Sequence, residues 1–299
     1  MIALSGLGLS AGRRAQQLGG AYICDRGSSH ICFQNEILKE EYRRYHSEWI
    51  GIDSRILAKE EEEYEQANWI SIPSQFCLDS FIAMGVPRHK LKKIPYGARL
   101  GRFSIDVSRS LIYPQNRTHE FRVLFVGQAG VRKGFVDLLK AFRLFKHPCR
   151  RLTLIGSIST EAKELLDHFP LDNVEIVGII PNDKLRQYYN KSSVFLLPSV
   201  EEGLAMVMGE AMACGLPVIA TANTGADDLF TNGQEGFIVP IRSPEIIADC
   251  LQNLADDPEL RSRMAIAASA RIDQMGGWDK YGSCWRDFLF ENFGQQIFS

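Results

Sequence analysis

Two glutamates frame a glycine in the stretch PSVEEGLAMVMGEAMACGLPVIAT, residues 198–221. Glu202 directly precedes Gly203, and Glu210 lies eight residues after Glu202. Eight residues are about two helical turns, so on a helix the two carboxylates would share one side. A carboxylate can accept two hydrogen bonds and therefore suits a vicinal diol, such as a ribose or a hexose. The alternative is that Glu210 is an ordinary exposed glutamate on a helix.

The same stretch is expected to place a helix start at the edge of a sheet. A strand signal ends at Leu197, and Gly203 is expected to open a helix that runs to about Ala213. The unpaired amides at such a start, near Gly203, Leu204 and Ala205, bind anions such as phosphate together with the positive end of the helix dipole. Glycine at position 203 would let a phosphate approach the backbone closely.

A basic pair, Arg132 and Lys133, lies in a glycine-flanked loop within VGQAGVRKGF, residues 126–135. The loop follows an apolar strand signal, so we expect it at the edge of a sheet where ligands bind. Two fixed positive charges at that edge could neutralise a diphosphate. Basic pairs are common in exposed loops, so the prediction depends on the position of this pair.

Alternating strand and helix signals predict the elements that position these residues. From residue 121 onward, short apolar runs alternate with mostly helical patterns, as in FRVLFVG, LTLIGS, VEIVG, SVFLLPS, LPVIAT and GFIVP. Such alternation predicts a doubly wound, mostly parallel sheet. Ligands of such sheets bind at the carboxyl ends of the strands.

The first hundred residues show the same alternation on a smaller scale. We expect a helix over 9–18, a strand over 21–24, a helix over 35–67, Ser74 as the N-cap of a further helix, and a strand over 91–94. The run GLGLSAG imitates a dinucleotide-binding fingerprint, which would indicate a nicotinamide-linked oxidoreductase. Only two or three residues precede it, so the strand that this fingerprint requires is barely present.

Composition excludes several classes of function. The 299 residues are 45% hydrophobic and 23% charged, with 34 basic and 36 acidic side chains. A formal charge of -2 provides no bulk attraction to nucleic acid or to an anionic membrane. The seven cysteines are scattered without metal-ligand spacing, and no D-x-D motif occurs. We therefore expect a cytoplasmic protein without a bound metal, and peripheral membrane contact stays open.

The stretch from Glu202 to Ile219 resembles the signature of retaining glycosyltransferases of family 4, E-G-F-G-x-x-x-x-E-A-M-A-x-G-x-P-V-I. The chain departs from this signature at Leu204 and Ala205, where the family commonly has an aromatic residue and a glycine. These departures alter side chains and leave the backbone amides in place. The resemblance implies that Glu210 holds the donor ribose and that Glu202 contacts the transferred sugar.

The basic loop resembles the G-R-x(n)-K-G loop of the same family. Lys133 matches the lysine before the glycine, and Gln128 follows Gly127 where the family usually has arginine. We therefore assign the role of that arginine to Arg132. The resemblance implies that these cations stabilise the leaving diphosphate and that Gly127 and Gln128 contact the donor.

Other segments extend the resemblance to nearly the whole chain. VEIVGIIPNDKLRQYYNKSSVFLLPS resembles the strand and base-contacting loop of the family, which makes Gly178 and Ile179 donor-binding candidates. Trp278 and the following helix resemble the final helix that crosses back to the first domain. In the amino-terminal part, the run CDRGSSH makes Asp25, Arg26 and His30 candidates for the acceptor side. For His30, a structural role is the alternative.

The expected fold is α/β, with two Rossmann-like doubly wound domains of the GT-B kind. We expect a partial acceptor-side domain over 1–105, a linker over 106–120, a donor-binding domain over 121–272 and a returning helix over 273–299. A first domain in this family has about 170 to 200 residues, a usual size for one domain. The first domain is therefore expected to be incomplete, or a partner completes its sheet.

The resulting functional hypothesis is metal-independent transfer of a sugar from a nucleoside-diphosphate sugar, with retention of configuration. The nucleotide sugar is expected as a substrate, no cofactor is expected, and the acceptor is an unidentified glycan, lipid or small molecule. The alternative is a catalytically inactive, truncated remnant or subunit that binds nucleotide sugar. Two glutamates alone do not indicate a glycosidase, whose carboxylates must flank the scissile bond.

Overall fold

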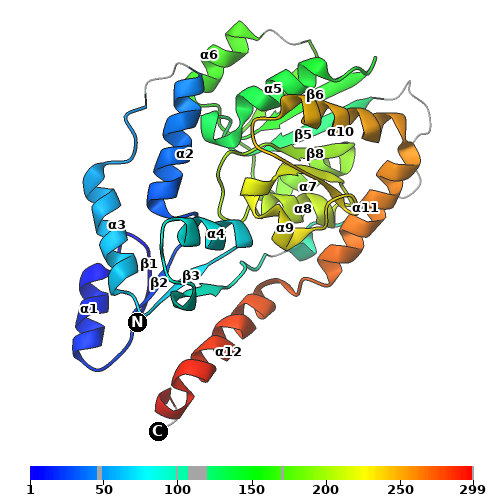
Figure 1. The fold of residues 1–299 in the computed structure, drawn as a ribbon. Coiled ribbons are helices and arrows are strands. Elements are labelled where there is room, and N and C mark those ends of the chain that lie inside the picture. The colour runs from blue at the N-terminus through cyan, green and yellow to red at the C-terminus, as the bar shows by residue number, and fades with distance from the viewer. Residues whose placement is uncertain (46–48, 99, 107–119, 170–171, 298–299) are drawn as a thin grey trace.

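The computed structural model describes residues 1–45, 49–98, 100–106, 120–169 and 172–297. Its strands form two separate sheets, both entirely parallel among the described residues (Figure 1). Helices cover these sheets, as the alternating strand and helix signals predict. The predicted α/β class with two parallel-sheet units is confirmed.

The first sheet has the order β1-β2-β3-β4. Its strands are β1 (Ile2–Leu4), β2 (Ile23–Asp25), β3 (Trp69–Ile72) and β4 (Leu91–Lys93). Its helices are α1 (Leu9–Gln17), α2 (Ile31–Arg44), α3 (Ser54–Gln66) and α4 (Gln75–Ala83), and a short 3-10 turn, η1 (Arg88–Lys90), precedes β4. The side chain of Ser74 accepts a hydrogen bond from the amide of Cys77, which confirms the predicted N-cap.

The single helix expected over 35–67 is wrong, because the structure has two helices, α2 and α3. The chain turns at Gly51, whose φ of 93° lies in the left-handed region. Asp53 then caps α3 by accepting a hydrogen bond from the amide of Arg55. Both helices are rich in charged residues, but the apolar run WIGI at 49–52 interrupts them and contains Gly51, so the sequence does carry a local signal for the break.

The second sheet has the order β10-β9-β8-β5-β6-β7, so β5 and β8 lie side by side at its centre. Its strands are β5 (Phe121–Val126), β6 (Arg150–Ile155), β7 (Val174–Gly178), β8 (Val194–Leu197), β9 (Val218–Thr221) and β10 (Gly236–Val239). The helices of this unit are α5 (Phe135–Leu144), α6 (Thr160–His168), α7 (Asn182–Lys191), α8 (Val207–Ala213), α9 (Ala226–Leu229), α10 (Pro244–Asp256) and α11 (Pro258–Asp273). Short 3-10 turns are η2 (Leu100–Arg102), η4 (Val131–Lys133) and η5 (Ala222–Thr224).

The final helix, α12 (Gly277–Ile297), returns to the first sheet (Figure 1). Phe288 of this helix is buried with Ile23 and Ile94, and Trp69 packs on the edge of the same cluster. The ring centroids of Trp69 and Phe288 lie 5.8 Å apart. The carboxyl-terminal helix therefore completes a core that belongs to the amino-terminal sheet.

Candidate functional site at the joined ends of β5 and β8

Two loops meet at the carboxyl ends of the central strands β5 and β8. The basic loop is residues 127–134 after β5, and the acidic loop is residues 198–206 after β8. Gly134 has a φ of 65°, and a Cβ atom there would overlap the carbonyl oxygen of Pro198. The amide of Val200 donates a hydrogen bond of 2.8 Å to the carbonyl of Arg132. Glycine at 134 thus permits both the left-handed backbone and the close packing of the two loops.

Charged side chains from these loops form one cluster. The ammonium group of Lys133 forms an ion pair with Oε1 of Glu202, and a guanidinium nitrogen of Arg132 lies 3.1 Å from the same oxygen. The side chains of Lys133 and Glu202 are 14% and 12% exposed, whereas that of Arg132 is 39% exposed. A carboxylate oxygen therefore lies between two cations where an oxygen of an anionic ligand could replace it.

The expectation that Gly203 opens a helix is wrong, because α8 begins at Val207. Contacts with the first domain hold the preceding segment in a loop. Ser74 Oγ donates a hydrogen bond of 2.6 Å to the carbonyl of Gly203, and a Cβ at this position would overlap the carbonyl oxygen of Gly27. Glycine at position 203 therefore serves the close approach of the two domains.

The amides of this segment differ in whether they donate a hydrogen bond within the protein. The amide of Ala205 donates a hydrogen bond of 3.1 Å to the carbonyl of Thr224. Within the described part of the chain, the amides of Gly203 and Leu204 donate to no acceptor. The side chains of Leu204 and Ala205 are both buried. Two of the three predicted amides thus have no acceptor within the described residues, and both belong to buried residues.

Glu210 lies on α8, away from the Lys133–Glu202 ion pair. The hydroxyl of Tyr189 on α7 donates a hydrogen bond of 3.0 Å to Oε2 of Glu210. Burial raises the pKa of Glu210, while hydrogen bonds from Tyr189 and Asn182 and the charge of Arg102 partly oppose this shift. The carboxylate is therefore held in a fixed orientation at the α7 side of the site.

Gly178 and Ile179 follow the edge strand β7. The side chain of Ile179 is 80% exposed, and Gly178 has a φ of 80°. In the sheet, β6 separates β7 from β5, the strand that precedes the basic loop. Asn182, three residues after Ile179, interacts with Glu210. The structure thus groups the predicted donor residues into a charged centre and a separate α7–α8 side.

A buried carboxylate that sequence reasoning missed, Glu201, connects the two domains. Its side chain is fully buried, and it accepts hydrogen bonds from Ser28 Oγ at 2.6 Å, Ser29 Oγ at 2.8 Å and Gln34 Nε2 at 2.8 Å. Arg132 lies 3.7 Å from the other side of the same carboxylate. Only the adjacency of Glu201 to Glu202 could have drawn attention to it, since the partners that donate hydrogen bonds to its side chain lie more than 160 residues earlier.

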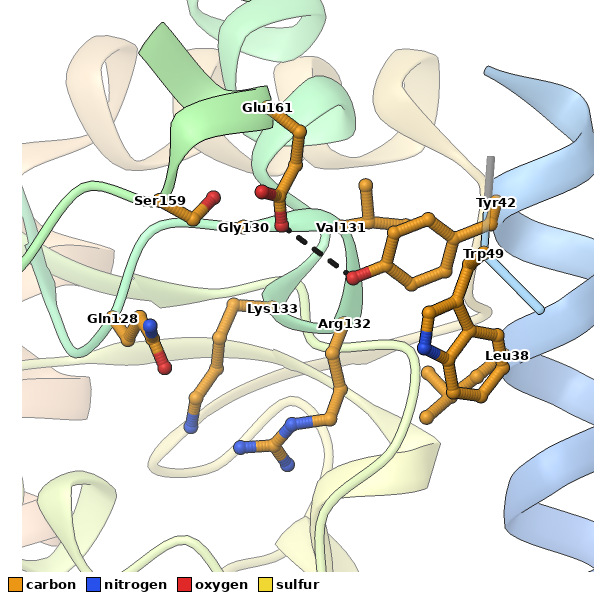
Figure 2. Close-up of a pocket in the computed structure, with 10 residues that line it drawn as sticks. All are labelled: Leu38, Tyr42, Trp49, Gln128, Gly130, Val131, Arg132, Lys133, Ser159 and Glu161. Carbon is orange, nitrogen blue, oxygen red and sulfur yellow. Dashed lines mark hydrogen bonds between the residues drawn. The ribbon is translucent and has the colours of Figure 1, made fainter. Parts of the chain in front are cut away.

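A pocket opens between the basic loop and the first domain (Figure 2). Residues of the basic loop line one side. Two aromatic residues line the other, Tyr42 on α2 and Trp49 after the end of α2. The lining residues are Leu38, Tyr42, Trp49, Gln128, Gly130, Val131, Arg132, Lys133, Ser159 and Glu161. Arg132 and Lys133 therefore face both this pocket and Glu202.

The family model for glycosyl transferases group 1 matches residues 113–271, which is more than half of the chain. This protein belongs to the glycosyl transferases group 1 family. The matched region contains both loops of the charged centre and all six strands of the second sheet.

Curated relatives are similar over part of their length. The amylovoran biosynthesis glycosyltransferase AmsK of Erwinia amylovora is 27% identical over 73% of this chain and 56% of its own. The capsular polysaccharide biosynthesis glycosyltransferase CapM of Staphylococcus aureus is 29% identical over 67% of this chain and 55% of its own. This group 1 chain thus spans about half the length of these curated relatives.

Solved structures share the fold. The sucrose-phosphate synthase of Thermosynechococcus elongatus superimposes with a TM-score of 0.78 at 22% identity, covering 97% of this chain and 74% of the other. HepE of Anabaena, solved with UDP and glucose, has a TM-score of 0.75 at 18% identity and covers 97% and 78%. These likenesses support the two-domain GT-B architecture of this group 1 protein.

The glycine-rich run GLGLSAG of this group 1 chain has a packing role. The amides of Gly8 and Leu9 each donate a hydrogen bond of 2.8 Å to Oε1 of Glu63, and Gly6 donates to its other oxygen. A Cβ on Gly8 would overlap the side chain of Tyr22. The amides that a dinucleotide phosphate would need are thus already paired with a carboxylate of the chain itself. This arrangement argues against the nicotinamide-linked alternative.

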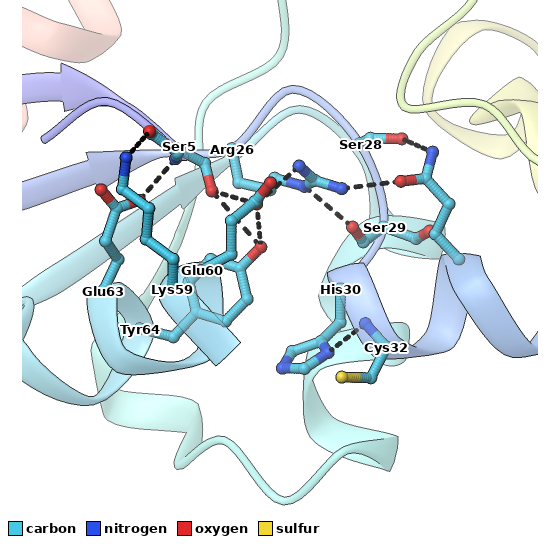
Figure 3. Close-up of polar contacts among 12 residues, drawn as sticks. Ser5, Arg26, Ser28, Ser29, His30, Cys32, Lys59, Glu60, Glu63 and Tyr64 are labelled. Carbon is cyan, nitrogen blue, oxygen red and sulfur yellow. Dashed lines mark hydrogen bonds and ion pairs between the residues drawn. The ribbon is translucent and has the colours of Figure 1, made fainter. Parts of the chain in front are cut away.

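The acceptor-side candidates of the first domain make internal contacts, and Figure 3 draws those of Arg26 and His30. Arg26 forms an ion pair of 2.7 Å with Glu60 and also donates to Ser29 and Gln34. Asp25 accepts a hydrogen bond of 2.7 Å from Ser71, and burial raises the pKa of Asp25. Both side chains therefore stabilise the loop after β2.

His30 lies in the core of the first domain. It is 4% exposed and caps α2, since its Nδ1 accepts a hydrogen bond from the amide of Cys32. Its ring packs against Tyr64 and Phe81, each with a centroid distance of 4.9 Å. Burial lowers the pKa of His30 to about 4, which keeps the ring neutral near pH 7. The structure therefore gives His30 a structural role, which was the alternative to the predicted acceptor-side role.

The described residues lack two features. They contain no group of three or more His, Cys, Asp or Glu side chains arranged to hold a metal ion. No helix within them is both long enough and apolar enough to cross a membrane.

Proposed function

We propose that this chain carries the donor-binding machinery of a glycosyltransferase that uses a nucleoside-diphosphate sugar. The observation that supports it most strongly is the pair Lys133 and Arg132 around Glu202, at the joined carboxyl ends of two central parallel strands. Membership of the glycosyl transferases group 1 family points to the same reaction class. HepE, which shares the fold, was solved in complexes with UDP and with UDP-glucose.

The reaction sets clear electrostatic requirements. The bond between the anomeric carbon and a diphosphate oxygen breaks, and a bond from this carbon to an acceptor hydroxyl oxygen forms. The nucleoside diphosphate leaves with the electron pair, and the proton of the hydroxyl passes to the leaving phosphate or to water. Negative charge therefore grows on the diphosphate, and fixed cations and amide dipoles stabilise it.

Each candidate residue has a distinct proposed role. Lys133 and Arg132 neutralise the diphosphate, and the amides of Gly203 and Leu204 bind its oxygens. As the donor binds, its phosphate oxygens replace Glu202 between the cations, and the released carboxylate can then accept hydroxyls of the sugar. Glu210, oriented by Tyr189, holds the ribose diol.

The finer features of the reaction are proposed from the family resemblance and from the cations of the site. Retention of configuration is what the match to family 4 glycosyltransferases implies. Cations of the chain replace the metal that other glycosyltransferases bind through a D-x-D motif, so the transfer is proposed to be metal-independent. The nucleotide sugar is a substrate, and no resident cofactor is part of the proposal.

Equilibrium titration tests the donor site directly. Diphosphates of uridine, guanosine, adenosine, cytidine and thymidine are titrated by calorimetry, followed by the sugar derivatives of the base that binds. Glu210→Ala removes the proposed ribose acceptor and should weaken affinity by about 10- to 100-fold, as expected for hydrogen bonds to a charged group. The control is Glu245→Ala, which removes an exposed glutamate of α10.

The outcomes separate binding from catalysis. Equal affinities of Glu210→Ala and wild type would remove Glu210 from the site, and no binding of any diphosphate would refute the donor proposal. Release of free sugar or transfer to an acceptor mixture identifies an enzyme. Tight donor binding without release or transfer identifies a binding remnant instead.

A further inference from the structure

An aromatic pair forms one wall of the pocket in Figure 2. Trp49 and Tyr42 are stacked, with ring centroids 5.1 Å apart and an interplanar angle of 23°. Both side chains line the pocket and are partly exposed. Stacked rings present a broad, rigid apolar surface at low conformational cost, because each side chain has only two rotatable bonds.

The opposite wall is polar. Glu161 accepts a hydrogen bond of 3.4 Å from the hydroxyl of Tyr42, and a carboxylate has further lone pairs for other donors. Ser159 and Gln128 add a hydroxyl and an amide, each able to donate and to accept. This wall therefore suits a ligand that carries several hydroxyl groups.

Contacts along α2 fix the aromatic wall relative to the second domain. Arg242 forms ion pairs of 2.9 Å with Glu40 and 2.6 Å with Glu41. The hydroxyl of Tyr45 donates a hydrogen bond of 3.3 Å to Asp137. These contacts flank Tyr42 on the same helix, so the two walls are held together before any ligand binds.

The pocket adjoins the charged centre. Arg132 and Lys133 line the pocket and also pair with Glu202. A molecule lying against Trp49 would therefore be next to the position proposed for the diphosphate and its sugar. No acceptor-side candidate of the loop after β2 lines this pocket, since the residues that line it come from α2, the segment at Trp49 and the second domain.

We propose that this pocket binds a sugar ring of the acceptor, with one face of the ring on Trp49 and its hydroxyls toward Glu161 and Gln128. A pyranose ring has an apolar C–H face and a polar hydroxyl edge, which match the two walls. The proposal rests on the proposed donor function, because the ring must present a hydroxyl to the centre at Lys133. It assigns a glycan acceptor to this chain.

The rival occupant is the base of the nucleotide, which could also stack on an aromatic ring. The geometry favours a sugar, because Glu210, the proposed ribose ligand, pairs with Tyr189 and Asn182 and does not line this pocket. If the base occupied this pocket, the ribose would lie on the α2 side of the basic loop and not at Glu210.

Saturation-transfer NMR titration with simple sugars tests the pocket without any glycosyl-transfer assay. The probes are methyl glycosides of glucose, galactose, mannose and N-acetylglucosamine, added to the full chain with and without saturating nucleoside diphosphate. We expect a saturable transfer signal for at least one glycoside, unaffected by the nucleotide. Trp49→Ala should weaken this binding about tenfold, in line with the worth of an aromatic contact plus the area it buries, and Trp49→Phe should largely restore it.

Trp278→Ala is the matched control, because this tryptophan is 50% exposed and does not line the pocket. Glycoside binding that is absent in wild type, or equal in Trp49→Ala and Trp278→Ala, would overturn the proposal. So would a loss of nucleoside-diphosphate affinity in Trp49→Ala, which would assign the pocket to the base. Failure of the donor function itself would appear as absent diphosphate binding in the wild type, independently of the glycoside result.

Discussion

In two regions of this molecule a carboxylate lies against a positively polarised group at the edge of a parallel sheet. Glu63 accepts hydrogen bonds from the amides of the glycine-rich loop after β1, and Glu202 pairs with Lys133 after β5. Glu63 is fully buried, whereas Glu202 and the nearby Arg132 retain exposed surface. The first arrangement is a closed part of the fold, and the second is the one where we propose that a ligand replaces the carboxylate. Position at a sheet edge therefore does not by itself make a binding site.

The largest expected effect is on the closed region. Glu63→Ala leaves three backbone amides without an acceptor, and at about 1–3 kcal/mol for each unsatisfied buried group the free energy of unfolding should fall by about 3–9 kcal/mol. Urea unfolding measures this change. The control is Glu62→Ala, whose partner Arg13 is 44% exposed, and its effect should stay below about 1 kcal/mol. Similar losses in the two variants would contradict the structural role of Glu63.

The second prediction concerns the open region. Lys133→Ala removes a cation that faces the developing negative charge, so the transfer rate should fall by about 10²- to 10³-fold. Stability should change much less than in Glu63→Ala, because the Lys133 site is partly open to solvent. Steady-state kinetics with the donor found by titration measures the rate. Lys163→Ala, at an exposed position of α6, is the control, and a rate for Lys133→Ala within twofold of this control would reject the assignment.

A third prediction concerns the link between the two domains. Ser29→Ala removes one of the hydrogen bonds to the buried carboxylate of Glu201. Hydrogen bonds to charged groups contribute about 1.5–3 kcal/mol, so unfolding free energy should fall by a similar amount. Ser54→Ala, at an exposed serine in the first turn of α3, should have little effect. If the two serine variants unfolded at the same urea concentration, Glu201 would not depend on Ser29.

The smallest effect is a pH dependence from His30. Its pKa is lowered from 6.5 to about 4 by burial, so between these values the unfolded chain binds a proton that the folded chain does not. The contribution of neutral His30 to stability is complete above pH 6.5 and is lost as the pH falls toward 4. The slope should be at most about 1.4 kcal/mol per pH unit.

His30→Asn keeps a side chain that can cap α2 and removes the titration. Urea unfolding at pH 7, 6 and 5 should show a shallower loss of stability for this variant than for wild type. His89→Asn, at an exposed histidine, should keep the slope of the wild type. An identical slope in all three proteins would show that His30 does not titrate in this way.

Sequence patterns predict the parts of this fold that depend on residues close together in the sequence. The apolar runs of the second sheet and the Ser74 cap follow from residues within one element. The meeting of Lys133 and Glu202 follows from the rule that carboxyl ends of parallel strands share an edge. These features needed no knowledge of contacts between domains.

Features that depend on distant contacts could not be predicted. Gly203 does not start a helix because Ser74 and Gly27, from the other domain, hold it in a loop. Glu201 is important through partners far away in the sequence, and no local pattern identifies them. The break between α2 and α3 differs, because it has a local signal: the apolar run WIGI at 49–52 interrupts the charged pattern and contains Gly51.

The return of α12 to the first sheet has a practical consequence for dividing this protein into fragments. By sequence the helix follows the second domain, but its Phe288 shields Ile23 and Ile94 of the first. A fragment cut before Gly277 would leave this apolar surface bare in water and prone to self-association. Isolating the amino-terminal module therefore calls for fusing residues 277–297 to it through a new connection.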